Sequence, residues 1–258
     1  MSVVGCVHLV GAGPGDPELL TVKALRLIQT AHVVVYDRLV GQAVLDLIPA
    51  GITKICVGKE SGHHLLPQDE INELLVRLAV PSRRVVRLKG GDPFIFGRGG
   101  EEMLHLMRHG IPVEVVPGIT AAAGCAAAAG IPLTHRHMAQ SLRLVTGHMR
   151  DDQDLDLDWA KLADPASTLV VYMGVGTVGR MADGLMRAGL AAQTPVAVIE
   201  RGTTGRQRNL YGSLESVEAD ILRWQVQPPA LIIIGRVVAL GAEHYAAEFG
   251  RLEAVPGE

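Results

Sequence analysis

The chain has 258 residues, of which 48% are hydrophobic and 20% are charged, and its formal net charge is −3 at pH 7. A general nucleic-acid or membrane-surface binder would carry an excess of Lys and Arg, so we expect no such partner. The three cysteines lie far apart and form no CxxC pair, which argues against a disulfide framework and fits a reducing cytoplasm. We see no signal-peptide pattern and no apolar run of membrane-spanning length, so we expect a cytoplasmic protein with small-molecule partners.

Short apolar runs alternate with segments of helical periodicity along the first half of the chain. Their hydrophobicity is continuous, which is typical of strands that are covered on both faces in a mostly parallel sheet. The predicted strands are residues 7–11, 32–37, 54–58, 85–91 and 113–118. Asp16 followed by Pro17 predicts the start of a helix, and the apolar spacing from Ile71 to Leu78 predicts a helix over residues 68–79.

The second half repeats this scheme. Its predicted strands are residues 141–147, 168–174, 195–202 and 230–238. We place the domain boundary near Pro117 and Gly118, which gives domains of residues 1–117 and 118–258. The predicted fold is α/β, with two domains built on mostly parallel or mixed sheets. Ligands gather outside the carboxyl ends of such strands, so we expect the active site in the cleft between the domains.

One loop carries more information than the rest of the chain. It begins at the end of the predicted strand at residues 85–91. Residues 89–102, which include the end of that strand, read KGGDPFIFGRGGEE. Glycine lets the backbone approach a bound molecule closely, and the charged residues of this loop place both signs around one spot. Loops that are held by rigid strands often carry function, so this segment predicts a ligand site.

The segment GAGPGD at residues 11–16 invites comparison with a dinucleotide-binding loop, and Asp37 lies near where a ribose-binding acid is expected. However, Asp16 stands where that motif requires its third glycine, and Pro14 and Pro17 delay the start of the helix. We interpret the segment as a proline-shaped loop for a ligand without a pyrophosphate. A nicotinamide oxidoreductase is the alternative from a different functional class.

Several short motifs occur in an order that identifies a family. They are VGAGPGDPELLT, VVVYDRLV, VGKE, RVVRLKGGDPFIFGRGGEE, VVPGITAA, GIPLTHR, VTGH, VVYMG, ERGTTGRQR and PALIIIGRVV. Over almost its whole length the chain resembles uroporphyrinogen-III C-methyltransferases, which have the tetrapyrrole methylase fold. The resemblance implies double C-methylation of uroporphyrinogen III to precorrin-2, in sirohaem, cobalamin or other modified-haem biosynthesis, by a homodimer. The methyl donor would be S-adenosylmethionine and its product S-adenosylhomocysteine. Methylation of a later corrin intermediate or of a macromolecule is the alternative within this fold.

The resemblance also implies a cofactor site. Its residues would be Pro14, Gly90, Gly91, Asp92, Ile95, Thr120, Ala121, Met173 and Gly202. Small residues dominate this set, as expected if main-chain groups recognise the adenine and methionine ends of the ligand. For Asp92 we favour a free carboxylate that faces the ribose hydroxyls over a cap of the following helix.

For the chemistry, the resemblance implies Asp37 as proton acceptor and Lys59 as proton donor. The residues alone are equally consistent with Asp37 as a turn residue at a strand end. The substrate carries many carboxylates, which guanidinium groups bind with two hydrogen bonds. Arg98 is expected to position the substrate, because its high pKa excludes it as a base. The other predicted substrate contacts are Arg38, Glu101, Arg136 and His148, with Arg87 and Arg206 as weaker candidates.

Three positions depart from the family pattern: Glu60 after VGK, and Ala128 and Met138 on either side of GIPLTHR. These changes concern the outer shape of the substrate pocket and not the reaction. The additional dehydrogenase and chelatase portion of some relatives is not recognised here, so we expect a monofunctional enzyme. His135 and His137 resemble a metal-binding pair, but no carboxylate or thiol stands nearby, so we predict no metal site.

Overall fold

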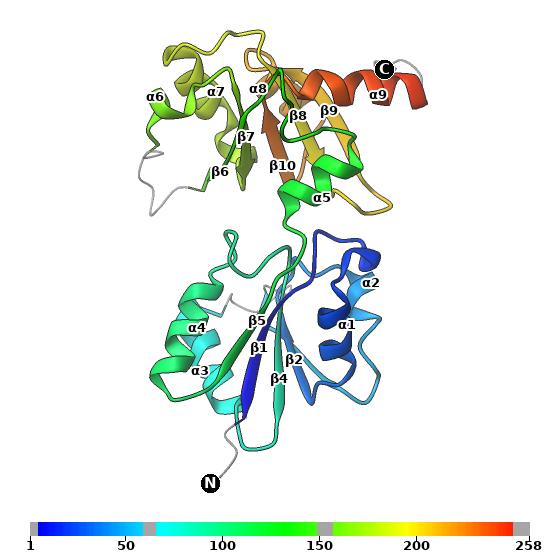
Figure 1. Cartoon of the computed structure of the whole chain (residues 1–258), viewed down its shortest axis with the longest axis vertical. Helices are drawn as coiled ribbons and strands as arrows, with labels where there is room; N and C mark the ends of the chain where they lie inside the picture. Colours follow the sequence, from blue (N-terminus) through cyan, green and yellow to red (C-terminus); the bar gives the residue numbers. More distant parts are fainter. Residues whose placement is uncertain (1–4, 59–65, 149–156, 250–258) are drawn as a thin grey trace. The chain divides into compact units, whose positions relative to one another are not determined.

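The computed structural model describes residues 5–58, 66–148 and 157–249. The chain divides into two compact units, Met1–Gly124 and Cys125–Glu258, each with its own sheet (Figure 1). The predicted boundary at 117/118 lies in the loop before α5 (Ala121–Ala128), whereas the two units divide within that helix.

The first unit is built on a five-stranded sheet in the order β3-β2-β4-β1-β5. All neighbouring strands in it are parallel, so their carboxyl ends meet at one edge. The strands are β1 (Cys6–Gly11), β2 (Val33–Tyr36), β3 (Thr53–Cys56), β4 (Arg84–Lys89) and β5 (Val113–Val116). Each of the five apolar runs in the sequence overlaps one of them, which confirms a parallel sheet in this half.

Helices cover both faces of this sheet (Figure 1). They are α1 (Val22–Gln29), α2 (Gln42–Leu45), α3 (Gln68–Leu78) and α4 (Gly99–Arg108). Alternate strand residues face opposite cores: Val34 packs with α1 and α2, whereas Val33 and Val35 pack with α3 and α4. Burial on both faces explains why the strands read as continuous apolar runs.

The first predicted helix starts later than Asp16 suggests. Asp16 caps only a 3₁₀ turn, η1 (Pro17–Leu19), by accepting the N–H of Glu18 at 2.8 Å. The α-helix begins at Val22, where the hydroxyl of Thr21 accepts the N–H of Ala24 at 3.1 Å. The prediction of one continuous helix was wrong because Leu20 is extended, which separates the two caps.

The second unit has a mixed sheet in the order β6-β7-β10-β8-β9. Its strands are β6 (Ser141–Thr146), β7 (Ser167–Tyr172), β8 (Pro195–Glu200), β9 (Arg208–Ser213) and β10 (Ala230–Ile234). β6 and β7 are parallel, β10 is antiparallel to both β7 and β8, and β9 is antiparallel to β8. The sequence analysis missed β9, whose half-buried residues lack a continuous apolar run.

The remaining elements of the second unit are α6 (Trp159–Leu162), η2 (Val175–Thr177), α7 (Val178–Arg187), α8 (Val217–Arg223) and α9 (Val238–Phe249). Met181 and Leu185 of α7 and Ile221 of α8 enter one core with Val171 and Ile232 of the sheet. Each unit therefore has a hydrophobic core of its own, which is the physical mark of a domain.

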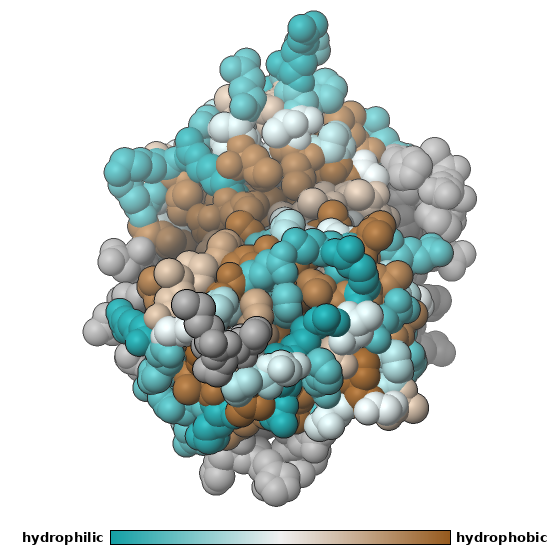
Figure 2. Space-filling model, turned by 60° about the horizontal axis from the view of Figure 1, so that its bottom comes forward, coloured by the Kyte–Doolittle hydropathy of each residue, from teal (hydrophilic) through white to brown (hydrophobic). Residues whose placement is uncertain are grey.

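Hydrophilic and hydrophobic residues alternate over the face of the molecule shown in Figure 2. The exposed apolar side chains include Phe94, Ile95 and Phe96, which follow one another in the glycine-rich loop after β4. Among the helices of the described ranges, none has both the length and the apolar character required to cross a bilayer.

Candidate functional site

The loops that leave the carboxyl ends of β1, β4 and β5 come together through glycine. A Cβ added to Gly118 would lie 2.3 Å from the carbonyl oxygen of Gly91 and 2.8 Å from Cα of Gly11. Both distances are far shorter than a van der Waals contact, and a Cβ on Gly11 would likewise lie 2.5 Å from Gly118 N, so these backbones approach closely only because Gly11 and Gly118 lack side chains. The glycines therefore draw three strand ends into one site.

We expect Gly118→Ala to destabilise the first unit by about 1–3 kcal/mol, the usual effect of overpacking. The added methyl group would meet the backbone of Gly91, which cannot rotate away as a flexible side chain can. Urea unfolding measures the free energy difference. Gly51→Ala is the matched control, because a Cβ there meets no atom within 4 Å. Equal stability of the two variants would contradict the close approach.

The GAGPGD loop is fixed to the loop after β4. Gly13 and Gly91 exchange backbone hydrogen bonds, at 3.1 Å from Gly13 N to Gly91 O and 2.7 Å in the other direction. Gly13 and Gly91 both have positive φ, at 73° and 67°. Because α1 begins only at Val22, the loop does not lead directly into a helix N-terminus that would hold a pyrophosphate. This geometry argues against the dinucleotide alternative.

Four residues of the predicted cofactor set lie around this junction. Gly91 lies beside Thr120 and Ala121: a Cβ on Gly91 would lie 3.8 Å from the N atom of Ala121 and 4.0 Å from Cα of Thr120. Pro14 packs against the start of α5, because its Cγ would lie 2.4 Å from a Cβ on Gly124. The junction is formed by main chain and small side chains, which suits a ligand that is recognised by backbone groups.

Gly90, which directly precedes Gly91, contacts the loop after β2. A Cβ on Gly90 would lie 2.6 Å from Cβ of Leu39, two residues after Asp37. The predicted proton acceptor is thus placed next to the predicted cofactor segment.

Asp92 does not present a free carboxylate, and it does not cap α4. Its Oδ1 accepts the N–H of Phe94 at 2.8 Å, and its Oδ2 accepts the N–H of Gly118 at 3.0 Å. Residue Arg98, not Asp92, precedes the first turn of α4. The cap interpretation was therefore wrong, and the carboxylate is bonded to backbone: Asp92 ties the loop after β4 to the loop after β5. Contact of Asp92 with a cofactor stays a prediction.

Asp37 follows β2 directly at the carboxyl edge. Its Oδ1 accepts the N–H of Leu39 at 3.1 Å, which forms the turn that the sequence allows. Its Oδ2 lies 3.6 Å from a terminal nitrogen of Arg87, and 26% of its side chain is exposed. Asp37 is therefore both a turn residue and a partly buried carboxylate that solvent or a ligand can reach.

A buried group of charges lies beside Asp37, and the sequence analysis missed it. Glu102 is fully buried, and its Oε1 accepts from Arg87 Nε at 3.1 Å, Lys89 Nζ at 2.9 Å and Gln68 Nε2 at 3.3 Å. Burial, and secondly the charge of Arg87, lower the pKa of the Lys89 ammonium, whereas Glu102 opposes this shift.

The burial of Arg87 corrects one weak prediction, because a side chain that is 3% exposed is not a surface clamp for substrate. The sequence does contain a signal for the buried charges of Arg87, Lys89 and Glu102. Arg87 and Lys89 are two apart in a strand, so they share one face of a sheet that is otherwise apolar. Two buried cations require buried anions, which Glu102 and Asp37 supply.

Arg98 and Glu101 pair with each other at the start of α4. The guanidinium donates to both carboxylate oxygens, at 2.9 Å from Nε and 2.7 Å from a terminal nitrogen. The hydrogen bonds from Arg98 lower the pKa of the Glu101 carboxyl. Both side chains are more than half exposed, and an ion pair of this kind contributes roughly 0.2–1 kcal/mol at most. A substrate carboxylate can therefore replace Glu101 on the guanidinium at little cost.

The loop that delivers Arg98 has an unusual backbone. Phe96 and Arg98 both have left-handed φ values, 53° and 58°, although neither is glycine. Ile95, a predicted cofactor contact, is partly exposed between Phe94 and Phe96. Left-handed conformations of bulky residues persist only where the surrounding structure holds them, and they often occur at ligand sites.

Three predicted residues of the second unit lie at one edge of its sheet. β6, β7 and β8 point in the same direction, since β10 is antiparallel to both β7 and β8. His148 follows β6, Met173 follows β7 and Gly202 follows β8. A Cβ on Gly147 would lie 2.6 Å from Cα of Gly174, so the neighbours of His148 and Met173 are in contact.

Met173 is half exposed and has a φ of 54°. Gly202 packs against the buried Cys125, whose Sγ would lie 2.3 Å from a Cβ at that position. Burial raises the pKa of the Cys125 thiol to about 12, so this cysteine serves packing and not nucleophilic chemistry.

The remaining predicted residues are less well connected. Arg38 is exposed, and its backbone lies against Gly58, directly before Lys59. Lys59 and Glu60 lie outside the described residues. Arg136 and Arg206 are exposed in the second unit, and the contacts among the described residues do not join Arg136 to His148 or Met173.

Comparison with known proteins gives a consistent family. The family profile described as “Tetrapyrrole (Corrin/Porphyrin) Methylases” matches residues 6–218. The chain is 58% identical over 237 residues to a siroheme synthase of Azotobacter vinelandii (strain DJ / ATCC BAA-1303), covering 92% of this chain and 51% of that protein. The chain therefore spans about half the length of this curated relative.

Two similar solved structures are of uroporphyrin III C-methyl transferase from Thermus thermophilus. The native form is 48% identical with a TM-score of 0.78, over 92% of this chain and 100% of that chain. The form complexed with S-adenyl homocysteine is 47% identical with a TM-score of 0.78, over 91% of this chain and 93% of that chain. The profile match, these identities and the two α/β units agree, and the chain belongs to the tetrapyrrole (corrin/porphyrin) methylase family.

Proposed function

We propose that this chain is a uroporphyrinogen-III C-methyltransferase, which transfers two methyl groups from S-adenosylmethionine to uroporphyrinogen III and gives precorrin-2. The observation that carries the proposal is the junction of Gly11, Gly91 and Gly118, where main chain and small side chains gather at the carboxyl edge of the sheet that also carries Asp37. The similarity to the Thermus uroporphyrin III C-methyl transferase over that protein's whole chain supports the same activity.

The glycine junction suits a methyl donor of this kind. S-adenosylmethionine is a sulfonium compound without a pyrophosphate, so it needs main-chain contacts and not an anion-binding helix end. Gly90, Gly91, Thr120 and Ala121 would hold it, with Pro14 closing the side next to α5. The similar Thermus structure with S-adenyl homocysteine supports this choice of ligand. Ile95, Met173 and Gly202 complete the proposed set.

In each transfer, a ring carbon of the substrate forms a bond to the methyl carbon, and the bond from that carbon to sulfur breaks. The sulfonium becomes the neutral thioether of S-adenosylhomocysteine, and the macrocycle loses a proton. Asp37 accepts this proton in our proposal, and Lys59 is the proposed donor. Arg98 orients the substrate through its carboxylates, with Arg38, Glu101, Arg136 and His148 as further proposed contacts.

The direct test is an anaerobic incubation of the chain with S-adenosylmethionine and enzymatically prepared uroporphyrinogen III. Mass spectrometry is expected to show that the tetrapyrrole gains two methyl groups. One molecule of S-adenosylhomocysteine is expected for each methyl group transferred. No gain in mass on this substrate, together with methylation of a later corrin intermediate or of a macromolecule, would favour the alternative within the family. Binding of NAD without binding of S-adenosylmethionine would instead favour an oxidoreductase.

The similarity to siroheme synthases supports sirohaem synthesis as the pathway that uses the product, with cobalamin synthesis as the alternative.

We further propose a cytoplasmic homodimer. The free thiols of Cys6, Cys56 and Cys125 fit a reducing compartment. Sedimentation equilibrium tests the dimer, and a monomer at micromolar concentration would count against it.

A further inference from the structure

One face of the first sheet changes from apolar to charged toward its carboxyl edge. Val35 of β2 pairs in register with Arg87 of β4, and both lie on the face that α3 and α4 cover. Side chains two residues apart share a face, so Asp37 and Lys89 continue the same two rows. The charged end of this face carries Asp37, Arg87 and Lys89.

Glu102, in the first turn of α4, covers these charges from the helix side. One of its oxygens takes all three hydrogen bonds, from Arg87, Lys89 and Gln68. Its Oε2 is buried and has no hydrogen-bond partner among the described residues. A buried carboxylate that leaves one oxygen unsatisfied is costly, and such a group calls for an explanation beyond packing.

Arg87 connects Glu102 to Asp37 through its guanidinium group. Its Nε is held by Glu102 and one terminal nitrogen faces Asp37 Oδ2 at 3.6 Å. With Nε fixed, the planar guanidinium has little freedom to turn, and its charge stays next to the Asp37 carboxylate. We propose that Glu102 is a positioning residue, which holds Arg87 so that Asp37 is oriented for proton transfer. This inference rests on the proposed function and on Asp37 as its base.

A double-mutant cycle tests the coupling. Single-turnover rates with saturating uroporphyrinogen III and S-adenosylmethionine are measured for the parent chain, Glu102→Gln, Asp37→Asn and the double variant. If Glu102 acts through Asp37, Glu102→Gln slows the parent by about tenfold, within the coupling range of residues in one ion-pair network. The same change is then expected to have almost no effect on a chain that already carries Asp37→Asn. Binding of S-adenosylhomocysteine is expected to stay unchanged throughout.

Leu106→Ala is the matched control, because Leu106 is fully buried on the same helix and packs in the apolar core. It lowers stability, and it is expected to show the same rate effect with and without Asp37→Asn. If Glu102→Gln does not fold, Arg87→Lys enters the cycle in its place, since it keeps the charge and loses the planar fork.

Each outcome has a distinct meaning. An equal effect of Glu102→Gln in both backgrounds overturns the positioning role and leaves the proposed function standing. A normal rate of Asp37→Asn removes the base on which the role depends, although methylation itself is intact. Absence of methylation by the parent chain refutes the proposed function and the positioning role together.

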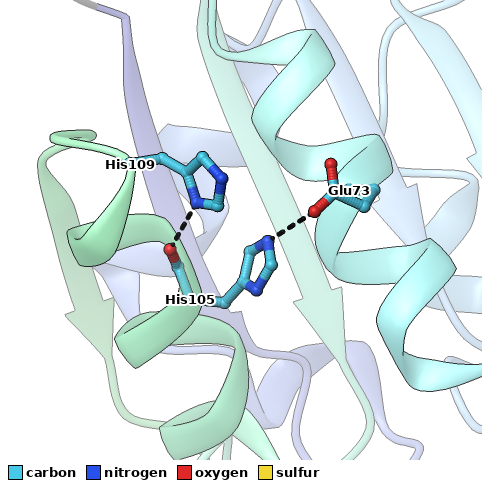
Figure 3. Close-up of side chains that lie close together, drawn as sticks. All are labelled: Glu73, His105 and His109. Carbon is cyan, nitrogen blue, oxygen red and sulfur yellow. Dashed lines mark hydrogen bonds and ion pairs between the residues drawn. The ribbon is translucent and has the colours of Figure 1, made fainter.

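A second and independent observation lies further along the same two helices. Figure 3 shows Glu73 of α3, His105 of α4 and His109, which directly follows α4; the three side chains face one another. One potential ligand atom from each residue lies within 4.8 Å of the other two. Tetrahedral zinc with ligands at about 2.0–2.2 Å would hold neighbouring ligand atoms about 3.3–3.6 Å apart, so small side-chain rotations suffice to form a site.

The contacts of the two imidazole groups suit them to bind a cation. His109 Nδ1 donates to the carbonyl oxygen of His105 at 2.9 Å, which leaves Nε2 as the lone-pair nitrogen of the neutral ring. His105 Nε2 lies 3.0 Å from Glu73 Oε1, but this contact lacks hydrogen-bond geometry, and the buried nitrogen has no hydrogen-bond partner among the described residues. The geometry points to a site for a zinc-like divalent cation that joins α3 to α4. The prediction of no metal rested on His135 and His137 alone, and this cluster was not predicted because Glu73 and His105 are far apart in the sequence.

Calorimetric titration of the tag-free, chelator-treated chain with zinc chloride tests this site. We expect one zinc per chain, and binding that is about 10- to 100-fold weaker in Glu73→Gln and in His109→Ala. Zinc is expected to raise the melting temperature of the parent but not of His109→Ala. His137→Ala is the control, because His135 and His137 form the other close pair of rings. Absence of binding, or binding that Glu73→Gln and His109→Ala leave unchanged, would overturn the site.

Discussion

Asp37→Asn is expected to lower kcat by roughly 10²- to 10⁴-fold, the contribution typical of a general base, with KM for both substrates little altered. Asparagine keeps the size of the side chain, and its amide oxygen can still accept the N–H of Leu39. It cannot accept the proton that the macrocycle loses. Rates of methyl transfer are measured by product mass, and cofactor affinity by titration with S-adenosylhomocysteine.

Asp46→Asn is the control for this change, because Asp46 is an exposed residue of the first unit whose carboxylate accepts from Gln42 Nε2. It is expected to leave kcat unchanged. If Asp37→Asn instead kept a near-normal kcat and weakened cofactor binding, Asp37 would belong to cofactor recognition and not to proton transfer.

Arg98→Ala is expected to lower turnover by about 10²-fold or more, while the affinity for S-adenosylhomocysteine hardly changes. The reason is that a fork of two hydrogen bonds to a carboxylate mainly supplies orientation, which a truncated side chain cannot replace. Arg98→Lys is expected to recover only part of the rate, since an ammonium is a point charge without the planar fork.

Arg108→Ala provides the comparison, because Arg108 is an exposed arginine in the last turn of the same helix. Its turnover is expected to match the parent chain. If Arg98→Ala and Arg108→Ala behaved alike, the pair of Arg98 with Glu101 would be only a surface contact of α4.

The sequence alone was sufficient for the strands of the first unit. Val33, Val34 and Val35 form a continuous apolar run because both faces of their strand are buried, and this signal is local. The glycines at residues 11, 91 and 118 were visible for the same reason, since a missing side chain is a property of the residue itself. The family motifs added the roles of Asp37 and Arg98, which stay predictions.

The tertiary structure decided which groups meet. An apolar run such as residues 230–234 carries no information on direction, so only the fold places β10 antiparallel between β7 and β8. Likewise, the sequence places Asp92 near a helix, whereas its carboxylate bonds to Gly118, which belongs to another strand end. The burial of Arg87 with Glu102 depends on α4 packing over β4, and Glu73 meets His105 only because α3 packs beside α4. Such contacts depend on the order of strands and helices in space, which the periodicity of a single segment does not contain.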